Sequence, residues 1–183
     1  MTEPLFIATE RFDRSDGETW QKYLEWAKIS ALTEVVSFDG ILCRHFVEEF
    51  SAEDWNHIVK ADFRLDYFRH LDYLLNRVRD VKRRNILGVY RNPDSHIGDA
   101  PAARDFGFVG YDLIDEETQI SALTNCGGFP DVFNNDELNN CELIEDFVRA
   151  VEVKKLLSEK YPEEPHAQCE LYALWRLNET AES

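Results

Sequence analysis

Two β-prone runs joined by four polar residues constrain this chain more than any other feature. The runs are FGFVGYDLID (106–115) and ISALT (120–124), and EETQ lies between them. A short polar connection between two runs rich in β-branched and aromatic residues is typical of an antiparallel hairpin. Gly107 and Gly110 interrupt the first run, which predicts a β-bulge or the close approach of another backbone. The chain is therefore expected to build an antiparallel sheet.

Other segments are predicted to extend this sheet. NILGVYR (85–91) is short and apolar, as expected of a buried strand. CELYALWRL (169–177) alternates apolar residues at period two, which favours a strand, with a helix as the alternative. TEVVSF (33–38) and ILCRHF (41–46) are joined by Asp-Gly, so we predict a second hairpin there.

Amphipathic periodicity predicts helices in three regions. GETWQKYLEWAKI (17–29) places its aromatic and aliphatic residues on one helical face. Ser51 is a candidate N-cap for one or two helices across 52–80, where apolar residues recur at spacings of three and four. The longest helix is predicted near 141–160, after two asparagines that serve as caps and before the Tyr-Pro pair that ends it.

A single domain accounts for the whole chain. Its 183 residues can bury a core, and 44% apolar and 13% aromatic residues exclude general disorder. We predict one α+β domain over residues 1–183, with an antiparallel sheet of about five or six strands packed with three to four helices. No apolar run approaches the ~20 residues of a membrane helix. Because the first residues also lack the pattern of a secretory signal, we expect a cytoplasmic protein without a membrane partner.

The net negative charge of the chain favours some classes of binding partner over others. The formal net charge is −16, and residues 92–183 hold 6 basic and 20 acidic residues. Such a surface repels nucleic acid and attracts basic proteins. The basic stretch 77–91 is the best candidate for a nucleic-acid patch, but ion pairs with acidic flanks explain it better. It could otherwise contact an acidic partner or a second copy of the chain.

Asn-Cys-Gly-Gly at 125–128 raises the question of catalysis. Glycines can turn backbone N–H groups toward an anion, and Cys126 could act as a nucleophile if His166 or His45 served as its base. However, no nucleophile signature surrounds Cys126, and a strand that runs into a Gly-Gly-Phe-Pro turn accounts for every residue. We therefore predict that Cys126 is the last buried residue of a strand.

The remaining cysteines suggest neither disulfides nor metal. Cys43, Cys141 and Cys169 are widely spaced, as expected of small buried residues in a reducing compartment. A metal site built from Cys141, Cys169, Cys126 and His166 would lack the paired spacing of structural zinc sites. Phosphate-binding glycine motifs are also missing from the sequence. We predict no metal and no cofactor.

Three fragments carry a resemblance to known proteins. VVSFDGILC (35–43), ISALTNCGGF (120–129) and YPEEPHAQC (161–169) resemble segments of a family of small bacterial hypothetical proteins. This resemblance implies no activity, cofactor or catalytic residue. In size, acidity and aromatic content the chain also resembles the immunity proteins of bacterial toxin systems.

These observations favour a binding protein over an enzyme. We expect a non-catalytic cytoplasmic protein that binds a basic protein, as an acidic immunity-type inhibitor or an accessory interaction protein. Aromatic residues near the acidic loops are candidate anchors for this contact, namely Trp55, Phe129, Phe133 and Tyr161. The alternative is a Cys–His hydrolase or transferase that uses Cys126 and His166. Self-association through 77–91 is a third hypothesis, and it would make the protein a homo-oligomer.

Overall fold

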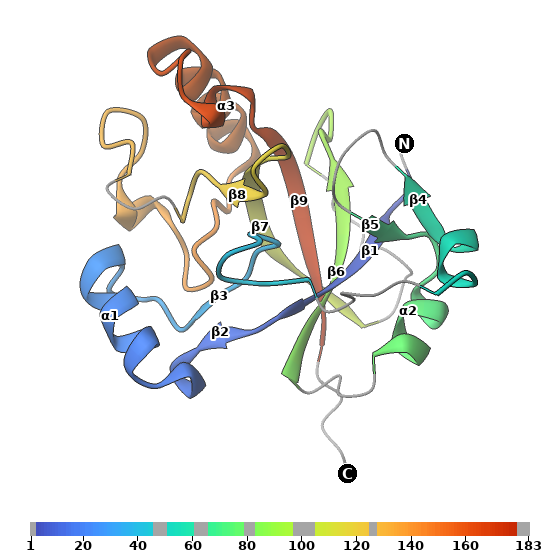
Figure 1. Ribbon diagram of the computed structural model, residues 1–183. Helices are drawn as coiled ribbons and strands as arrows, with labels where there is room; N and C mark the ends of the chain where they lie inside the picture. Colours follow the sequence, from blue (N-terminus) through green and yellow to red (C-terminus); the bar gives the residue numbers. More distant parts are fainter. Residues whose placement is uncertain are drawn as a thin grey trace.

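An antiparallel sheet of seven strands forms the centre of the fold, in the order β4-β5-β1-β6-β9-β7-β8 (Figure 1). The computed structural model describes residues 3–45, 51–60, 66–78, 83–96, 105–124 and 128–178. The central strands are β1 (Leu5–Glu10), β6 (Arg84–Arg91), β9 (Glu170–Leu177) and β7 (Phe106–Asp115). The shorter outer strands are β4 (Ile58–Lys60), β5 (Asp66–Phe68) and β8 (Ile120–Ser121), and β2 (Phe12–Asp13) pairs with β3 (Glu34–Val35) in a separate small sheet.

The single-domain α+β class is confirmed, although the main sheet has more strands than expected. The strands predicted at 85–91, 106–115 and 169–177 are present as β6, β7 and β9. β7 and β8 form the predicted hairpin around the polar EETQ connection. The first strand, β1, was not anticipated, although four successive buried residues mark it as a central strand.

Within the described ranges, three α-helices pack on the sheet. They are α1 (Glu18–Ala27), α2 (Leu71–Arg77) and α3 (Phe147–Lys160). The larger apolar cluster contains buried residues of α1 and α3, and the smaller one lies beneath α2. Successive residues of β1 divide between these clusters, because side chains of a strand alternate between its two faces. The sheet is therefore covered on both sides (Figure 1).

The hairpin predicted over 33–46 is wrong. β3 pairs with β2, and the chain then turns instead of forming a second strand. The Asp39 carboxylate accepts hydrogen bonds from the N–H groups of Ile41 and Leu42, at 2.8 and 3.0 Å. Asp39 thus directs its own backbone into a turn, a common role of this residue type. Phe46, the last residue of the predicted hairpin, lies outside the described residues.

The helical prediction over 52–80 is correct only at its end. The prediction of Ser51 as an N-cap is wrong, because Glu53 is the N-cap of a single turn of 3-10 helix (Asp54–Asn56). Ser51 Oγ accepts a hydrogen bond from the N–H of Asp54 at 3.2 Å. β4 and β5 follow, and α2 occupies the last part of the region. The helix predicted near 141–160 begins later than expected, at Phe147, because Asp146 is the residue that caps it.

A bulge in β7 lets another segment approach the sheet closely. The register between β7 and β9 shifts between Phe108 and Gly110, as the two glycines of this strand predicted. Gly110 has a φ of +144°, and a Cβ atom placed there would lie 2.6 Å from Cβ of Leu143 and 3.1 Å from the carbonyl oxygen of Ile144. Only glycine accommodates both this backbone conformation and this approach.

We expect Gly110→Ala to destabilise the protein by about 2–4 kcal/mol, because it combines backbone strain with overlap against Leu143. The measurement is the free energy of unfolding in urea. Gly107→Ala is the matched control: its Cβ would meet one flexible side-chain atom, Oδ1 of Asn178, at 3.2 Å. This control should change stability by less than about 1 kcal/mol. Equal effects of the two substitutions would contradict the account of the bulge.

Candidate functional site

Three of the buried carboxyl groups lie close enough to influence one another electrostatically. Asp39, Asp112 and Glu142 are 1%, 0% and 3% exposed. None of them forms an ion pair with a basic residue of the described part of the chain; their hydrogen-bond donors are uncharged. Buried carboxyl groups without a counter-ion are rare, since removing a carboxylate from water is costly.

Asp39 connects the turn after β3 to the segment around β8. In addition to its own turn, its Oδ2 accepts hydrogen bonds from the N–H of Ser121 at 3.0 Å and from Oγ1 of Thr124 at 2.9 Å. Four donors therefore surround this carboxylate, which accounts for its burial.

Asp112 holds the same two segments to β7. The hydroxyl groups of Ser37 and Ser121 each donate to it at 2.5 Å, and the N–H of Leu113 donates at 2.8 Å. Burial raises the pKa of Asp112 to about 6, although these three donors act in the opposite direction. Asp39 and Asp112 therefore have a structural role: they fix the backbone on which the neighbouring cavity is built.

Glu142 is presented by a tight turn against the β7 bulge. The side chain of Asn139 shapes this turn: its Oδ1 accepts from the N–H of Cys141 at 2.9 Å and of Leu143 at 3.1 Å. Its Nδ2 donates to the carbonyl oxygen of Val109 at 2.7 Å, which fastens the turn to β7. Glu142 itself has a φ of +64°, an uncommon and strained conformation for a residue with a side chain.

The Glu142 carboxyl group has a single hydrogen-bond partner. The Tyr23 hydroxyl group, from α1, donates to Oε2 at 2.6 Å. The other oxygen, Oε1, has no partner among the residues that the structure describes. Burial raises the pKa of Glu142 to about 8, with a further contribution from the negative charges of Asp112 and Asp39. The carboxyl group is therefore mostly protonated at neutral pH.

Glu142 lines a cavity of about 490 Å³ between the end of α1 and the segment 128–136. Aromatic and short polar side chains make up much of the lining, including Trp26, Phe129, Phe133, Thr124, Asn134 and Asn135. Asn135 fastens this segment to α1, since its Nδ2 donates to the carbonyl oxygen of Ala27 at 2.5 Å. The volume is typical of a site for a small ligand or a single side chain.

A second cavity, of about 570 Å³, lies between α1 and the turn after β3. Its lining is more apolar and includes Phe12, Ile41 and Leu42. Both cavities are bordered by Trp26 and Thr124. Glu142 lines the first cavity, whereas Asp39 lines the second.

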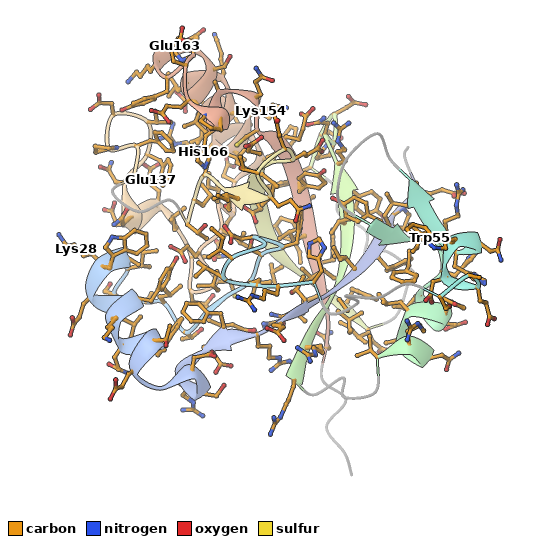
Figure 2. All side chains as sticks on the ribbon, viewed as in Figure 1. Lys28, Trp55, Glu137, Lys154, Glu163 and His166 are labelled. Carbon is orange, nitrogen blue, oxygen red and sulfur yellow. The ribbon has the colours of Figure 1, made fainter. Side chains whose placement is uncertain are left out.

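The four aromatic residues predicted as binding anchors have different surroundings. Trp55 is 45% exposed and lies far from Glu163 and His166 (Figure 2). Phe129 and Phe133 are buried: both are 4% exposed and pack in the larger cluster, so neither is an exposed anchor. They nevertheless line the Glu142 cavity. Tyr161 is half-buried and contacts Phe129, with 4.9 Å between the ring centroids.

The predicted catalytic pair cannot be assembled from the described residues. Cys126 lies outside them, so its prediction as the last residue of a strand stays a prediction; β8 already ends at Ser121. His166 is 8% exposed, and its ring lies 5.4 Å from that of Phe129. Neither ring nitrogen of His166 has a hydrogen-bond partner in the described part of the chain. Burial lowers the pKa of His166, which favours the neutral imidazole.

The other cysteines behave as predicted. Cys43, Cys141 and Cys169 are buried and free. Burial raises the pKa of each thiol, so none has the lowered pKa of a reactive cysteine.

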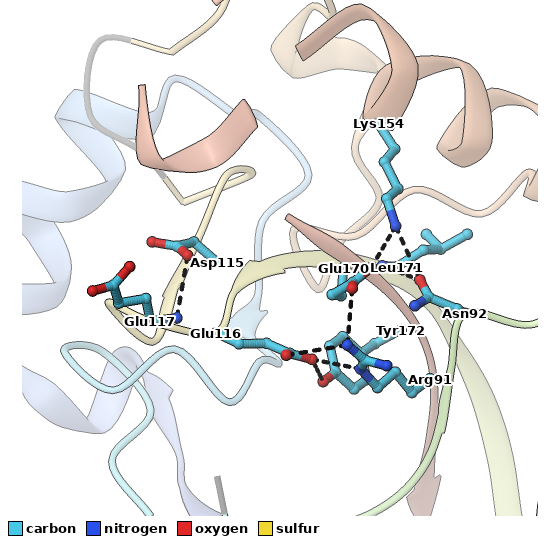
Figure 3. Close-up of polar contacts among 9 residues, drawn as sticks. All are labelled: Arg91, Asn92, Asp115, Glu116, Glu117, Lys154, Glu170, Leu171 and Tyr172. Carbon is cyan, nitrogen blue, oxygen red and sulfur yellow. Dashed lines mark hydrogen bonds and ion pairs between the residues drawn. The ribbon is translucent and has the colours of Figure 1, made fainter. Parts of the chain in front are cut away.

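Arginines of the basic stretch 77–91 are engaged within the fold, as expected. Arg77 pairs with Asp54 at 2.7 Å and Arg84 with Glu10 at 2.8 Å. Arg91 pairs with both Glu116 and Glu170 (Figure 3). Residues 79–82 lie outside the described residues.

The Arg91 network connects β6 and β9 with the β7–β8 turn and with α3. In addition to Arg91, Glu116 accepts a hydrogen bond from the Tyr172 hydroxyl group, and Lys154 of α3 bridges Glu170 and Asn92 (Figure 3). Each charged group here has an oppositely charged partner, so the network serves to hold α3 against the sheet.

No metal site among the described residues and no similar known protein indicates a function for this chain. Among the described residues, no group of three or more His, Cys, Asp or Glu side chains is arranged to hold a metal ion. The same part of the chain contains no helix that is long and apolar enough to cross a membrane. The chain matches no family model, no curated protein and no solved structure. The functional argument therefore depends on the site itself.

We expect Glu142 to make the stability of the protein depend on pH. Its pKa in the folded protein, about 8, exceeds the ordinary value of 4.5. The stabilisation from the protonated group is therefore complete below 4.5 and is lost as the pH rises through 8. Compared with Glu142→Gln, the wild type should lose up to ~1.4 kcal/mol per pH unit across this window, as measured by urea unfolding.

Glu145→Gln is the matched control, because Glu145 is an exposed carboxylate three residues away. Its stability relative to the wild type should change little between pH 5 and 9. A constant difference between Glu142→Gln and the wild type over the same range would show that Glu142 titrates normally.

Proposed function

We propose that the protein is a non-catalytic binding protein whose partner is a basic protein, as an immunity-type inhibitor or an accessory interaction protein. The pairing of its arginines carries this proposal. Arg77, Arg84, Arg91, Arg149 and Arg176 each contact a carboxylate of their own chain at 2.6 to 2.8 Å. With these cations neutralised internally, the excess of acidic residues acts outward and attracts positive charge.

An acidic rim beside the Glu142 cavity is the best candidate for the contact surface. We define it by four exposed residues: Asp131, Asp136, Glu163 and Glu164. The two segments that carry them lie together, because Lys160 donates to the carbonyl oxygen of Asp131 and Phe129 contacts Tyr161. None of the four carboxylates forms an ion pair with a described basic residue. They remain available to a partner.

Aromatic surface beside the rim supports a protein as the partner. Tyr161 is partly exposed, and Phe129 beneath it borders the cavity. Interfaces commonly combine such rigid rings at the centre with charged groups at the edge, where the charges govern the association rate. Trp55 lies away from this surface and is not required by the proposal (Figure 2).

Neutralising the acidic rim should weaken partner binding. The quadruple variant Asp131→Asn, Asp136→Asn, Glu163→Gln, Glu164→Gln removes charge and preserves shape. A basic protein that the wild-type chain retains from host extract at low salt should bind the variant about tenfold more weakly or worse. The purified pair would be measured by titration calorimetry at several salt concentrations, and the salt dependence should decrease in the variant.

An equal loss of charge elsewhere is the control. Glu18, Glu25, Asp72 and Asp94 are exposed and lie outside the rim, so their amide variants should change affinity by less than about threefold. Two results would contradict binding through the charge of the rim. One is retention of the basic protein that does not depend on salt concentration, and the other is an equal loss of affinity in the two quadruple variants.

One observation favours the enzymatic alternative. His166 is buried with both ring nitrogens unpartnered by described residues, and it contacts Phe129, three residues after Cys126. A neutral imidazole in that position would suit a general base for a nearby thiol.

Alkylation of Cys126 separates the two functions. For a binding protein, iodoacetamide should modify Cys126 only after denaturant is added. An activated nucleophile would instead react in the native protein, and His166→Ala would slow that reaction by about tenfold or more. Cys126→Ser provides the background, because the other three cysteines are buried.

A further inference from the structure

Once Glu142 loses its proton, the Glu142 cavity holds more negative than positive charge. The unpartnered oxygen of Glu142 belongs to a residue that lines the cavity, and Asp136 contributes a second carboxylate to the lining. Lys28 also borders the cavity, but its side chain is exposed at the end of α1 and forms no ion pair with a described carboxylate (Figure 2). The ionised Glu142 carboxylate therefore has no paired counter-ion among the described residues.

The surroundings favour a cation as the occupant. Asp39 and Asp112 lie near enough to Glu142 to raise its pKa, so their charges add to the negative potential there. Trp26, Phe129 and Phe133 supply aromatic surface, which attracts cations through the ring quadrupole. An anion would meet repulsion from several carboxylates, and a neutral ligand would leave the charge of the ionised Glu142 uncompensated.

The hydrogen bonding of Glu142 selects among cations. A metal ion requires several oxygen, nitrogen or sulfur ligands, and no such group is present in the described residues. A guanidinium group binds a carboxylate best through both oxygens, but Tyr23 already occupies Oε2. An ammonium group is a point charge that needs a single acceptor, and Oε1 provides one.

We propose that this cavity binds a protonated alkylamine, whose ammonium group pairs with Oε1 of Glu142 and whose carbon chain packs against Trp26 and Phe129. A free amine and a lysine side chain of another protein offer the same chemical group. The inference goes beyond the proposed function, because a free amine would occupy the cavity even if no basic protein did.

Binding is linked to the protonation of Glu142. The ammonium group needs the carboxylate, so it competes with the proton that Glu142 holds at neutral pH. Tyr23 from α1, Asp39 from the turn after β3 and Asp112 from β7 face this group, and Tyr23 stays protonated because burial raises its pKa. Lys28 and Asp136 border the cavity at the surface. Affinity should therefore increase from pH 6 to about pH 9, where an alkylamine with a pKa of ~10.4 is still charged.

The test uses n-butylammonium chloride and the complete ¹⁵N-labelled chain at about pH 9 and constant ionic strength. Saturable shifts of the Trp26 indole N–H resonance, assigned with Trp26→Phe, should report binding. n-Butanol, which has a similar chain and no charge, should bind about tenfold more weakly or worse. Equal binding of the alcohol and the amine, or no saturable shift, would overturn the proposal.

Two variants of the same site test the pairing. Glu142→Gln should weaken n-butylammonium binding by about tenfold or more, whereas the exposed control Glu145→Gln should change it by less than about twofold. Tyr23→Phe frees the second carboxylate oxygen, so the affinity for n-butylguanidinium should rise relative to n-butylammonium. If Glu142→Gln binds the amine as well as the wild type, Glu142 is not the counter-ion.

A short peptide separates the two sources of the amine. Blocked Gly-Gly-Lys-Gly-Gly should bind as tightly as n-butylammonium if the cavity receives a lysine side chain of another protein. Binding of n-butylammonium alone identifies a free amine as the ligand. Both results are independent of the acidic-rim variants, so failure of the proposed protein partner and failure of the amine site are distinguishable.

Discussion

The close contact between the turn at 138–144 and the β7 bulge supports the rest of the candidate site. Tyr111 and Ile144 exchange two backbone hydrogen bonds, at 2.7 and 3.1 Å, directly beside Gly110. Asn139 ties the same turn to the carbonyl oxygen of Val109. Since Gly110 has no side chain, the turn can lie against the strand, and its strained residue Glu142 is directed toward α1 and the cavity. Sheet geometry and cavity chemistry are therefore linked through one glycine.

The buried carboxyl groups of Asp39 and Asp112 differ in role from that of Glu142. Asp39 and Asp112 are surrounded by uncharged donors, and such satisfied groups stabilise a unique arrangement of the backbone. Glu142 accepts one hydrogen bond, and its other carboxyl oxygen has no partner among the described residues. Ionising this buried group therefore costs free energy, and the group can gain or lose a proton near neutral pH. A buried acid that is incompletely satisfied is unfavourable for stability alone. This contrast is the reason to assign binding to Glu142 and structure to the other two.

The sequence predicted the parts of the fold that depend on local patterns. β6, β7 and β9 are long, apolar strands, and α1 has an uninterrupted amphipathic face. The prediction at 33–46 was wrong because one side chain, Asp39, overrides the β-propensity of its neighbours. Glu142 was missed because its partner Tyr23 is 119 residues away, and no local spacing reveals such a pair. Asn139 was taken for a helix cap, although its side chain does cap a turn.

The lengths of the outermost strands limit how the sheet can grow. The sheet ends in β4, with three residues, and β8, with two. Each of these borders offers few unpaired backbone groups, so an extended chain laid alongside would gain little from ladder hydrogen bonds. Copies of this protein are thereby discouraged from joining sheet to sheet into fibres, even though the interior strands are strongly apolar. Along the described borders of the sheet, association would therefore depend on side chains, where charge and shape can select the partner.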